Sequence, residues 1–238
     1  MRDRSYMLIG MISSTVLSVV LMASSLLKAV NVHSFAVEVL LFSESYVSSS
    51  LAPFCVEIAC AVCAMELLLS MLLMRGRCKI AASALSFVLL SFFVALTGMN
   101  LLMPSSIGSI ESCGCFGELI HFSPLGAFVK SVVLWCVSIL CLMSLYKGQC
   151  FHMCTRKTDK GMLLDALVFL LVSVAPPMFS LLCMEHMGAE TYMSVYVLAC
   201  AAIVCYAVGG VMTQVRGLLR IDNILYNQVR KGGGNTLD

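Results

Sequence analysis

Apolar residues in this chain come in long blocks, without the alternation of a half-buried strand or the narrow stripe of a surface helix. A helix needs about 20 apolar residues to cross the hydrocarbon core of a bilayer. Six blocks are about that long, and they cover residues 6–30, 51–74, 80–103, 125–146, 162–184 and 192–215. The pattern therefore predicts an all-α polytopic membrane protein with six transmembrane helices.

Composition supports this prediction. Of the 238 residues, 60% are hydrophobic and 12% are charged, and the mean hydropathy is +0.97. A soluble domain carries roughly 25% charged residues, so a soluble globular protein is excluded and the lipid bilayer is the expected surrounding. The net charge of +2 gives no indication of a nucleic-acid partner.

Lysine and arginine occur in every second polar segment. They are Arg2 and Arg4 before the first block, Arg75, Arg77 and Lys79 after the second, Lys147, Arg156, Lys157 and Lys160 after the fourth, and Arg216, Arg220, Arg230 and Lys231 after the sixth. The three intervening segments hold glutamates instead, namely Glu38, Glu44, Glu111, Glu118, Glu185 and Glu190. Cytoplasmic loops carry the positive excess. We therefore expect both termini in the cytoplasm, and the loop after the third span on the periplasmic or external side of the cell (inner) membrane.

Three ionisable residues lie where the predicted spans meet the outer surface. Lys28 is at the end of the first span, Glu57 at the start of the second and Lys130 near the start of the fourth. Depth alone therefore puts two cations and one anion near the loop after the third span. A lysine at a span end can extend its ammonium to the interface, and this is the role that we expect for Lys28.

Glu66 lies close to the middle of the second span. An ionisable group at that depth is costly and indicates a bundle interior or a functional site. At 100° per residue, Glu66 faces away from Glu57 and shares a face with Cys55, Ala59 and Val62. Two roles for Glu66 stay open. It could form an interhelical hydrogen bond as a protonated carboxyl, or it could have a proton- or quinone-related role.

Three further segments carry local expectations. The mixed apolar and polar stretch 31–50 predicts a short interfacial helix. Pro176 and Pro177 should break or kink the fifth span, because proline removes a backbone donor and clashes with the preceding turn. After residue 215 we expect a short interfacial helix followed by a disordered end.

Location separates the 13 cysteines into groups. Cysteines within spans behave mainly as small apolar residues, and those on the reducing cytoplasmic side are expected to stay thiols. Only Cys113 and Cys115 lie clearly in the oxidising compartment. Cys55 and Cys183, at the outer ends of two spans, are their candidate neighbours.

Cys113 and Cys115 are one residue apart, in the segment CGCFG (residues 113–117). Their Cα atoms can just reach the separation of about 4.4 to 6.8 Å that a disulfide tolerates. So small a ring is strained, and strained exposed disulfides are the ones used in exchange. Nearby cations would favour the attacking thiolate, whereas the flanking Glu111 and Glu118 act against it.

Two other interpretations of the pair stay open. Either cysteine could instead form a bridge to Cys55 or Cys183. A metal site made by Cys113, Cys115 and His121 is a further alternative, although our expectation is that no metal is bound. Thiol–disulfide exchange is the interpretation that we favour.

The order of these features resembles the MauE family, the methylamine-utilisation membrane proteins grouped with the DoxX-like proteins. The matching residues are Lys28 at the end of the first span, Glu66 in the second, Arg75 in the basic inner turn and the CGCFG segment before the fourth span. The resemblance covers about residues 5–146. Two departures are Ser24-Ser25, where the family has a glycine before the lysine, and Lys130-Ser131 in place of Arg-Asn.

The resemblance implies a four-helix redox-associated membrane domain over residues 5–146, similar in layout to the vitamin K epoxide reductase type of bundle. Two additional transmembrane helices (147–215) and a cytoplasmic tail (216–238) would follow it. The resemblance also implies a thioredoxin-like or cysteine-containing exported partner. Methylamine use itself is not indicated by the residues.

Three hypotheses follow. The leading one is a membrane thiol–disulfide redox protein, resembling a thiol–disulfide oxidoreductase, with Cys113 and Cys115 as the redox pair and Lys28, Glu57, Glu66 and Lys130 in support. The second is a non-catalytic assembly factor for an exported partner. The third is a small-molecule carrier. No cofactor is specified by the sequence, and a quinone is one candidate.

Overall fold

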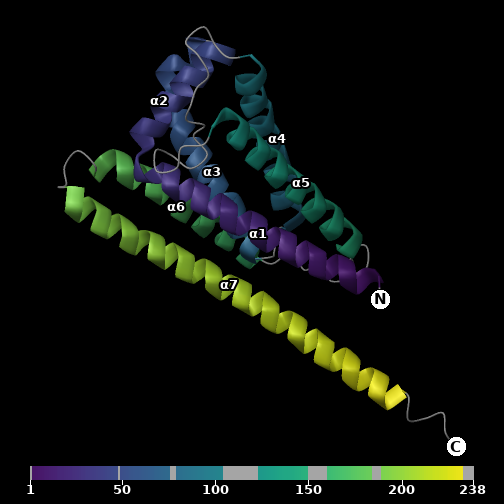
Figure 1. The fold of residues 1–238 in the computed structure, drawn as a ribbon. Coiled ribbons are helices and arrows are strands. Elements are labelled where there is room, and N and C mark those ends of the chain that lie inside the picture. The colour runs from purple at the N-terminus through teal and green to yellow at the C-terminus, as the bar shows by residue number, and fades with distance from the viewer. Residues whose placement is uncertain are drawn as a thin grey trace, which may run out of the picture.

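The computed structural model describes residues 2–47, 49–75, 79–103, 123–149, 160–183 and 189–232, and all the regular structure in them is helical (Figure 1). The all-α prediction is confirmed. The helices are α1 (Arg2–Val30), α2 (Val32–Phe42), the π-helix η1 (Ser43–Val47), the 3₁₀ helix η2 (Ser49–Phe54), α3 (Cys55–Arg75), α4 (Lys79–Leu102), α5 (Pro124–Gln149), α6 (Lys160–Cys183) and α7 (Ala189–Gly232).

Five stretches within the described residues are long and apolar enough to cross a membrane. They are Leu8–Val30, Ser50–Met74, Lys79–Leu102, Pro124–Lys147 and Glu190–Met212. Helix α6 contributes a shorter apolar stretch, Leu167–Cys183. Many large apolar side chains on these helices are exposed, which suits contact with lipid tails. The fold is that of a polytopic membrane protein, and the count of six spans stays a prediction.

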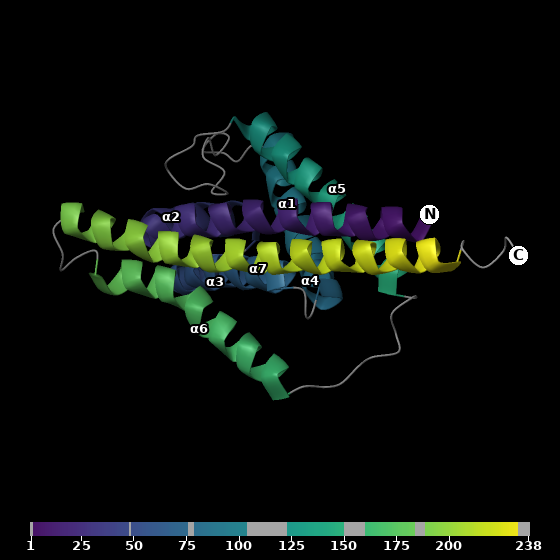
Figure 2. The same cartoon turned by 90° about the horizontal axis from the view of Figure 1, so that it is seen from below.

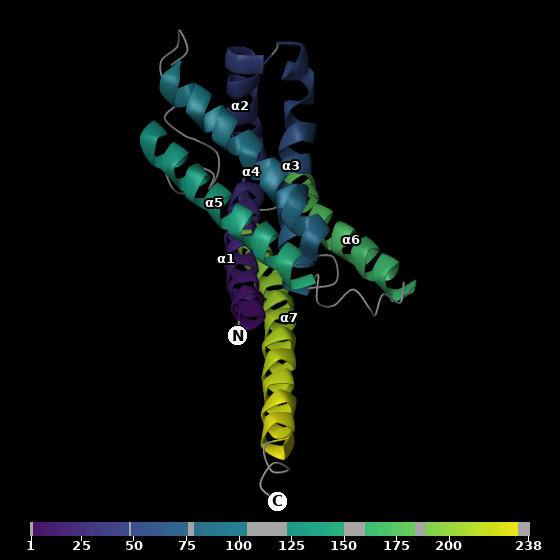
Figure 3. The ribbon, with the colours of Figure 1, turned by 90° about the vertical axis from the view of Figure 1, so that its right-hand side faces the viewer.

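Helices α1, α3, α4 and α5 form a closed ring of neighbours. Helix α1 packs against α3 and α5, and α4 packs against α5 and α3 (Figures 1 and 3). Helix α6 lies against α3 and α1, outside this ring. The C-termini of α1 and α4 and the N-termini of α3 and α5 therefore lie at the same end of the ring. Helix α2 lies at that end too.

Serines line the contact between α1 and α3. Ser18 Oγ donates to the carbonyl oxygen of Ser70 at 2.7 Å, and Ser70 Oγ donates back to the carbonyl oxygen of Ser18 at 2.8 Å. Ser25 Oγ donates to the carbonyl oxygen of Cys63 at 2.7 Å. Small side chains let membrane helices approach closely, and their hydroxyls then reach the facing backbone. This contact fixes the register of α1 against α3.

The short helix expected in residues 31–50 is present as α2. It begins after Asn31, whose side chain accepts a hydrogen bond from the Ser34 N–H, and it packs mainly on α3. Beyond it, the Tyr46 hydroxyl donates to Asn100 Oδ1 at 3.3 Å and to the Met103 carbonyl oxygen at 3.1 Å. The segment after α1 thus folds back over the bundle and reaches the end of α4.

Pro176 and Pro177 lie inside α6 without ending it. Of the two outcomes predicted, a break or a kink, the break is absent, and the helix bends along its length (Figure 2). A proline removes one intrahelical hydrogen bond and tilts the axis, and neighbouring groups can compensate for the backbone carbonyls that it frees.

Helix α7 runs without a break to Gly232 and extends beyond the other helices (Figure 3). A separate helix after residue 215 was the wrong expectation, because no proline between 189 and 232 interrupts the helical backbone. Two tyrosines tie its first half to α1. Tyr192 donates to the Val30 carbonyl oxygen and Tyr196 to the Leu26 carbonyl oxygen, both at 2.7 Å.

Candidate functional site

Cys113, Cys115 and the other residues of their loop, His121 included, lie outside the described residues. The two ends of that connection are described. Helix α4 ends at Leu102, and α5 begins at Pro124 after Ser123, whose Oγ accepts a hydrogen bond from the Gly126 N–H at 3.2 Å. The Cys loop is therefore attached at the α2 end of the bundle.

Lys28 and Glu66 form a buried pair at the α1–α3 contact. The distance from Lys28 Nζ to Glu66 Oε1 is 2.5 Å, and each side chain is only 1% exposed. The expectation that Lys28 extends to the interface is wrong. The bundle interior is confirmed for Glu66, and its partner is the lysine that we expected at the interface.

Side-chain direction explains why Lys28 turns inward. The register set by Ser18–Ser70 and Ser25–Cys63 puts Glu66 level with Met22, six residues or roughly 9 Å before Lys28 along α1. Helical side chains lean toward the N-terminus of their own helix. Because α1 and α3 are antiparallel, the Lys28 and Glu66 side chains lean toward each other and close that gap.

Two aromatic rings surround the Lys28 ammonium on its other sides. Lys28 Nζ lies 5.1 Å from the centre of the Phe35 ring in α2 and 5.0 Å from the centre of the Phe93 ring in α4. A cation over an aromatic face within about 6 Å is attracted by the ring quadrupole, more strongly away from water. Lys28 thus joins α1, α2, α3 and α4 at one point.

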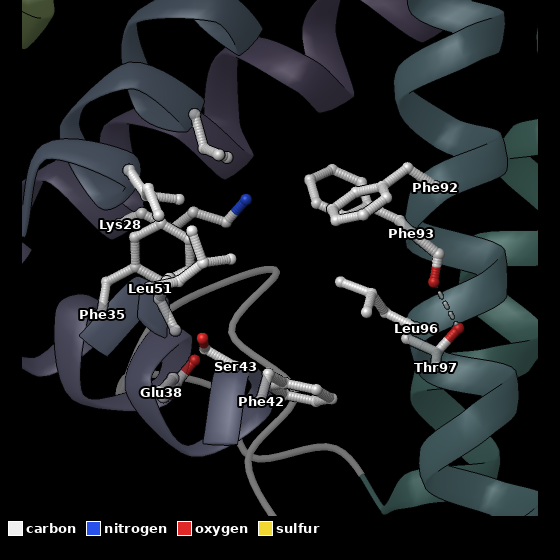
Figure 4. Close-up of a pocket in the computed structure, with 13 residues that line it drawn as sticks. Lys28, Phe35, Glu38, Phe42, Ser43, Leu51, Phe92, Phe93, Leu96 and Thr97 are labelled. Atoms are coloured by element: carbon white, nitrogen blue, oxygen red, sulfur yellow. Dashed lines mark hydrogen bonds between the residues drawn. The ribbon is translucent and has the colours of Figure 1, made fainter. Parts of the chain in front are cut away.

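A cavity of about 270 Å³ lies beside the ammonium, between α2, α3 and α4 (Figure 4). Its walls are mainly apolar, with a few polar groups. The lining residues are Lys28, Phe35, Glu38, Val39, Phe42, Ser43, Leu51, Ile58, Val62, Phe92, Phe93, Leu96 and Thr97. An apolar pocket with a few converging polar groups is the usual form of a small-molecule site.

Glu57 does not join the buried Lys28–Glu66 pair. Glu57 is exposed in the first turn of α3 while Glu66 is buried, so the predicted opposite orientation of the two acids is confirmed. Lys130 is half-buried in the second turn of α5. Glu57 is therefore on another face of α3 than Glu66, and the association of Lys28, Glu57 and Lys130 with the Cys loop stays a prediction.

Cys55 begins α3 and Cys183 ends α6. Cys55 is buried at the start of α3, where its thiol donates to the Leu51 carbonyl oxygen at 3.5 Å. Cys183 is half-buried at the end of α6. Their proposed bridges to the Cys loop stay a prediction.

Sequence reasoning missed the residues that α2 contributes, above all Phe35 and Glu38. One signal was available: Glu38 is the one acid in α2, a mostly apolar helix. A second signal was the row of buried serines on α1, Ser14, Ser18 and Ser25, which continues at helical spacing to Lys28. That row marks the face that packs on α3.

The chain matches a known family over its first four long helices. The family model described as methylamine utilisation protein MauE matches residues 6–144, which is more than half of the chain and includes both Lys28 and Glu66 as well as the CGCFG segment. No curated protein and no solved structure matches the chain.

Proposed function

Since this chain belongs to the MauE family, we propose that it is a multi-pass membrane protein that supports thiol–disulfide exchange in an exported protein through Cys113 and Cys115. The observation that carries the proposal is the CGCFG segment within the matched residues. Its loop is attached at the end of the bundle where α2 covers the ion pair. The proposed location is the cell (inner) membrane, with this end on the periplasmic or external side.

The chemistry needs only the two sulfurs and a partner dithiol. A thiolate of the exported partner attacks one sulfur of the Cys113–Cys115 disulfide and forms a mixed disulfide, which the second partner thiol then resolves. The partner loses two electrons and two protons, and the Cys113–Cys115 pair gains them. A thioredoxin-like protein, or another cysteine-containing exported protein, is the proposed partner.

The supporting residues divide into two proposed roles. Lys28 and Glu66 hold α1 on α3 beneath α2, and so position the end of the bundle from which the loop extends. Lys130 follows the loop by less than two turns of α5, and a cation near a cysteine favours its thiolate. Exposed Glu57 is available to a partner that approaches this end.

Alkylation of thiols in cells tests the proposal. We expect Cys113 and Cys115 to change between protected and reactive states when cells are shifted between oxidant and reductant. A Cys115→Ser single variant cannot form the Cys113–Cys115 disulfide, so it is tested in the reverse direction. The Cys113 thiolate attacks a disulfide of the exported protein and releases one of its thiols, and the mixed disulfide should accumulate because Cys115, which would displace the second partner thiol, is missing. The readout is a mass-tagging reagent followed by electrophoresis under non-reducing conditions.

The matched control removes two other cysteines. Cys136→Ser/Cys205→Ser changes exposed thiols on α5 and α7, and it should leave both results unchanged. If the pair keeps a single redox state and a Cys113→Ser/Cys115→Ser variant still supports maturation of the exported protein, exchange is not the function. That outcome would favour the non-catalytic assembly role.

A further inference from the structure

The cavity beside Lys28 lies between helices of which three, α1, α3 and α4, contain stretches apolar enough to span a membrane. Its walls come from α1, α2, α3 and α4, including Lys28, Phe35, Ile58 and Phe93. The lining is mainly apolar, which suits a ligand that is soluble in lipid. We propose that this cavity binds a neutral ring compound with carbonyl groups, of the quinone class.

The size of the cavity suits a substituted ring. An apolar cavity of about 150 Å³ takes up benzene, and the cavity here measures about 270 Å³. The additional space matches ring substituents or the first part of a lipid tail. A ligand that consisted of one ring without substituents would leave part of the cavity empty.

Aromatic side chains occupy opposite walls. Phe35 and Phe42 come from α2, and Phe92 and Phe93 face them from α4 across the open space (Figure 4). Aromatic rings prefer offset or edge-to-face packing against other rings. A flat ring between the two walls would make such contacts on both faces, which a flexible acyl chain cannot do.

The polar groups select a neutral acceptor. The Lys28 ammonium points into the cavity between the aromatic walls (Figure 4), and an ammonium donates hydrogen bonds. Its charge is already balanced by Glu66, and buried Glu38 adds an acid to the lining. A carboxylate ligand would add a further negative charge beside Glu66 and Glu38. A carbonyl oxygen accepts from Lys28 without that cost.

Photolabelling tests this inference and does not depend on the cysteines. The full chain in lipid nanodiscs is irradiated with a photoreactive short-chain quinone, and labelled residues are located by mass spectrometry. We expect labels on the cavity walls, and competition by an unreactive short-chain quinone. A Cys113→Ser/Cys115→Ser variant should be labelled as strongly as the unmodified chain. Quinone binding can therefore fail while the proposed exchange function stands, and exchange can fail while quinone binding stands.

Two variants with the same substitution on α4 provide the matched comparison. Leu96→Trp fills the cavity from its wall, whereas Leu85→Trp changes a side chain that is 56% exposed and lies outside the lining. In Leu96→Trp, the quinone concentration that gives half-saturation of labelling should rise at least about tenfold, as expected for loss of the aromatic and hydrogen-bond contacts. Leu85→Trp should behave as the unmodified chain.

A second variant tests the head-group contact. Lys28→Met/Glu66→Met removes both charges together, so that neither is left buried alone. It should weaken quinone labelling roughly tenfold, the loss expected for one charge-assisted hydrogen bond. Labels confined to sites outside the cavity would overturn the inference. Equal labelling of Leu96→Trp, or equal competition by decanoic acid, would do the same.

Discussion

Glu66→Met should lower the free energy of unfolding by about 3 to 5 kcal/mol, the usual cost of removing one partner from a buried ion pair. The change leaves the Lys28 ammonium inside the bundle, 1% exposed and between the Phe35 and Phe93 rings. Lys28→Met should also destabilise, at the lower end of that range, because an isolated Glu66 carboxyl can become neutral by taking up a proton.

The double variant Lys28→Met/Glu66→Met shows whether stability depends on the ion pair itself or on the volume that the two side chains fill. Replacing a buried pair by apolar side chains of similar volume is often neutral, so Lys28→Met/Glu66→Met should lie within about 1 kcal/mol of the unmodified chain. The measurement is unfolding in a titration of mixed micelles with sodium dodecyl sulfate. Trp135, the one tryptophan, reports on it, because its ring stacks on Phe87 and its Nε1 donates to Ser91.

Glu57→Met is the matched control, since it makes the same change at an exposed position of the same helix. It should alter the free energy of unfolding by less than about 0.5 kcal/mol. A double variant as unstable as the sum of the two single variants would mean that the pair does not act as a unit. The description of Lys28 and Glu66 as one interaction would then be abandoned.

Ser18→Leu should have the next largest effect, a loss of about 1 to 3 kcal/mol from overpacking. Ser18 is fully buried, and its Oγ lies 2.7 Å from the Ser70 carbonyl oxygen and 3.2 Å from Ser70 Oγ. A leucine would push α1 away from α3. The register that brings Lys28 to Glu66 would shift with it.

Two companion variants separate volume from hydrogen bonding. Ser18→Ala removes the hydroxyl without adding bulk and should cost about 0.6 kcal/mol, the average for a hydrogen bond between membrane helices. Ser194→Leu makes the larger change on the exposed surface of α7 and should be close to neutral. If Ser18→Leu unfolds at the same detergent fraction as Ser194→Leu, the contact between α1 and α3 is looser than described.

The proposals for the two regions are connected through α2. Its Phe35 covers the Lys28 ammonium, and its Glu38 and Phe42 line the cavity. The Tyr46 hydroxyl then reaches Met103, at the end of α4 from which the Cys loop continues. If binding of a ligand in the cavity changes the rate of exchange at the loop, we expect this segment to carry the effect.

The sequence by itself determined the class of fold and the faces of single helices. A bilayer sets the length of an apolar block, so the spans could be located without knowledge of their neighbours. Helical periodicity likewise predicted that Glu66 and Glu57 face opposite sides of the same helix. Both inferences depend only on residues close together in the chain.

Only the tertiary structure decided which groups meet. Lys28 finds Glu66 because hydroxyl–carbonyl contacts between α1 and α3 set an antiparallel register in which both side chains lean across the same gap. The cavity exists because α2 folds back and sets Phe35 opposite Phe93. A lysine at a span end looks the same in sequence whether it extends to water or turns inward. The position of the neighbouring helix settles the choice.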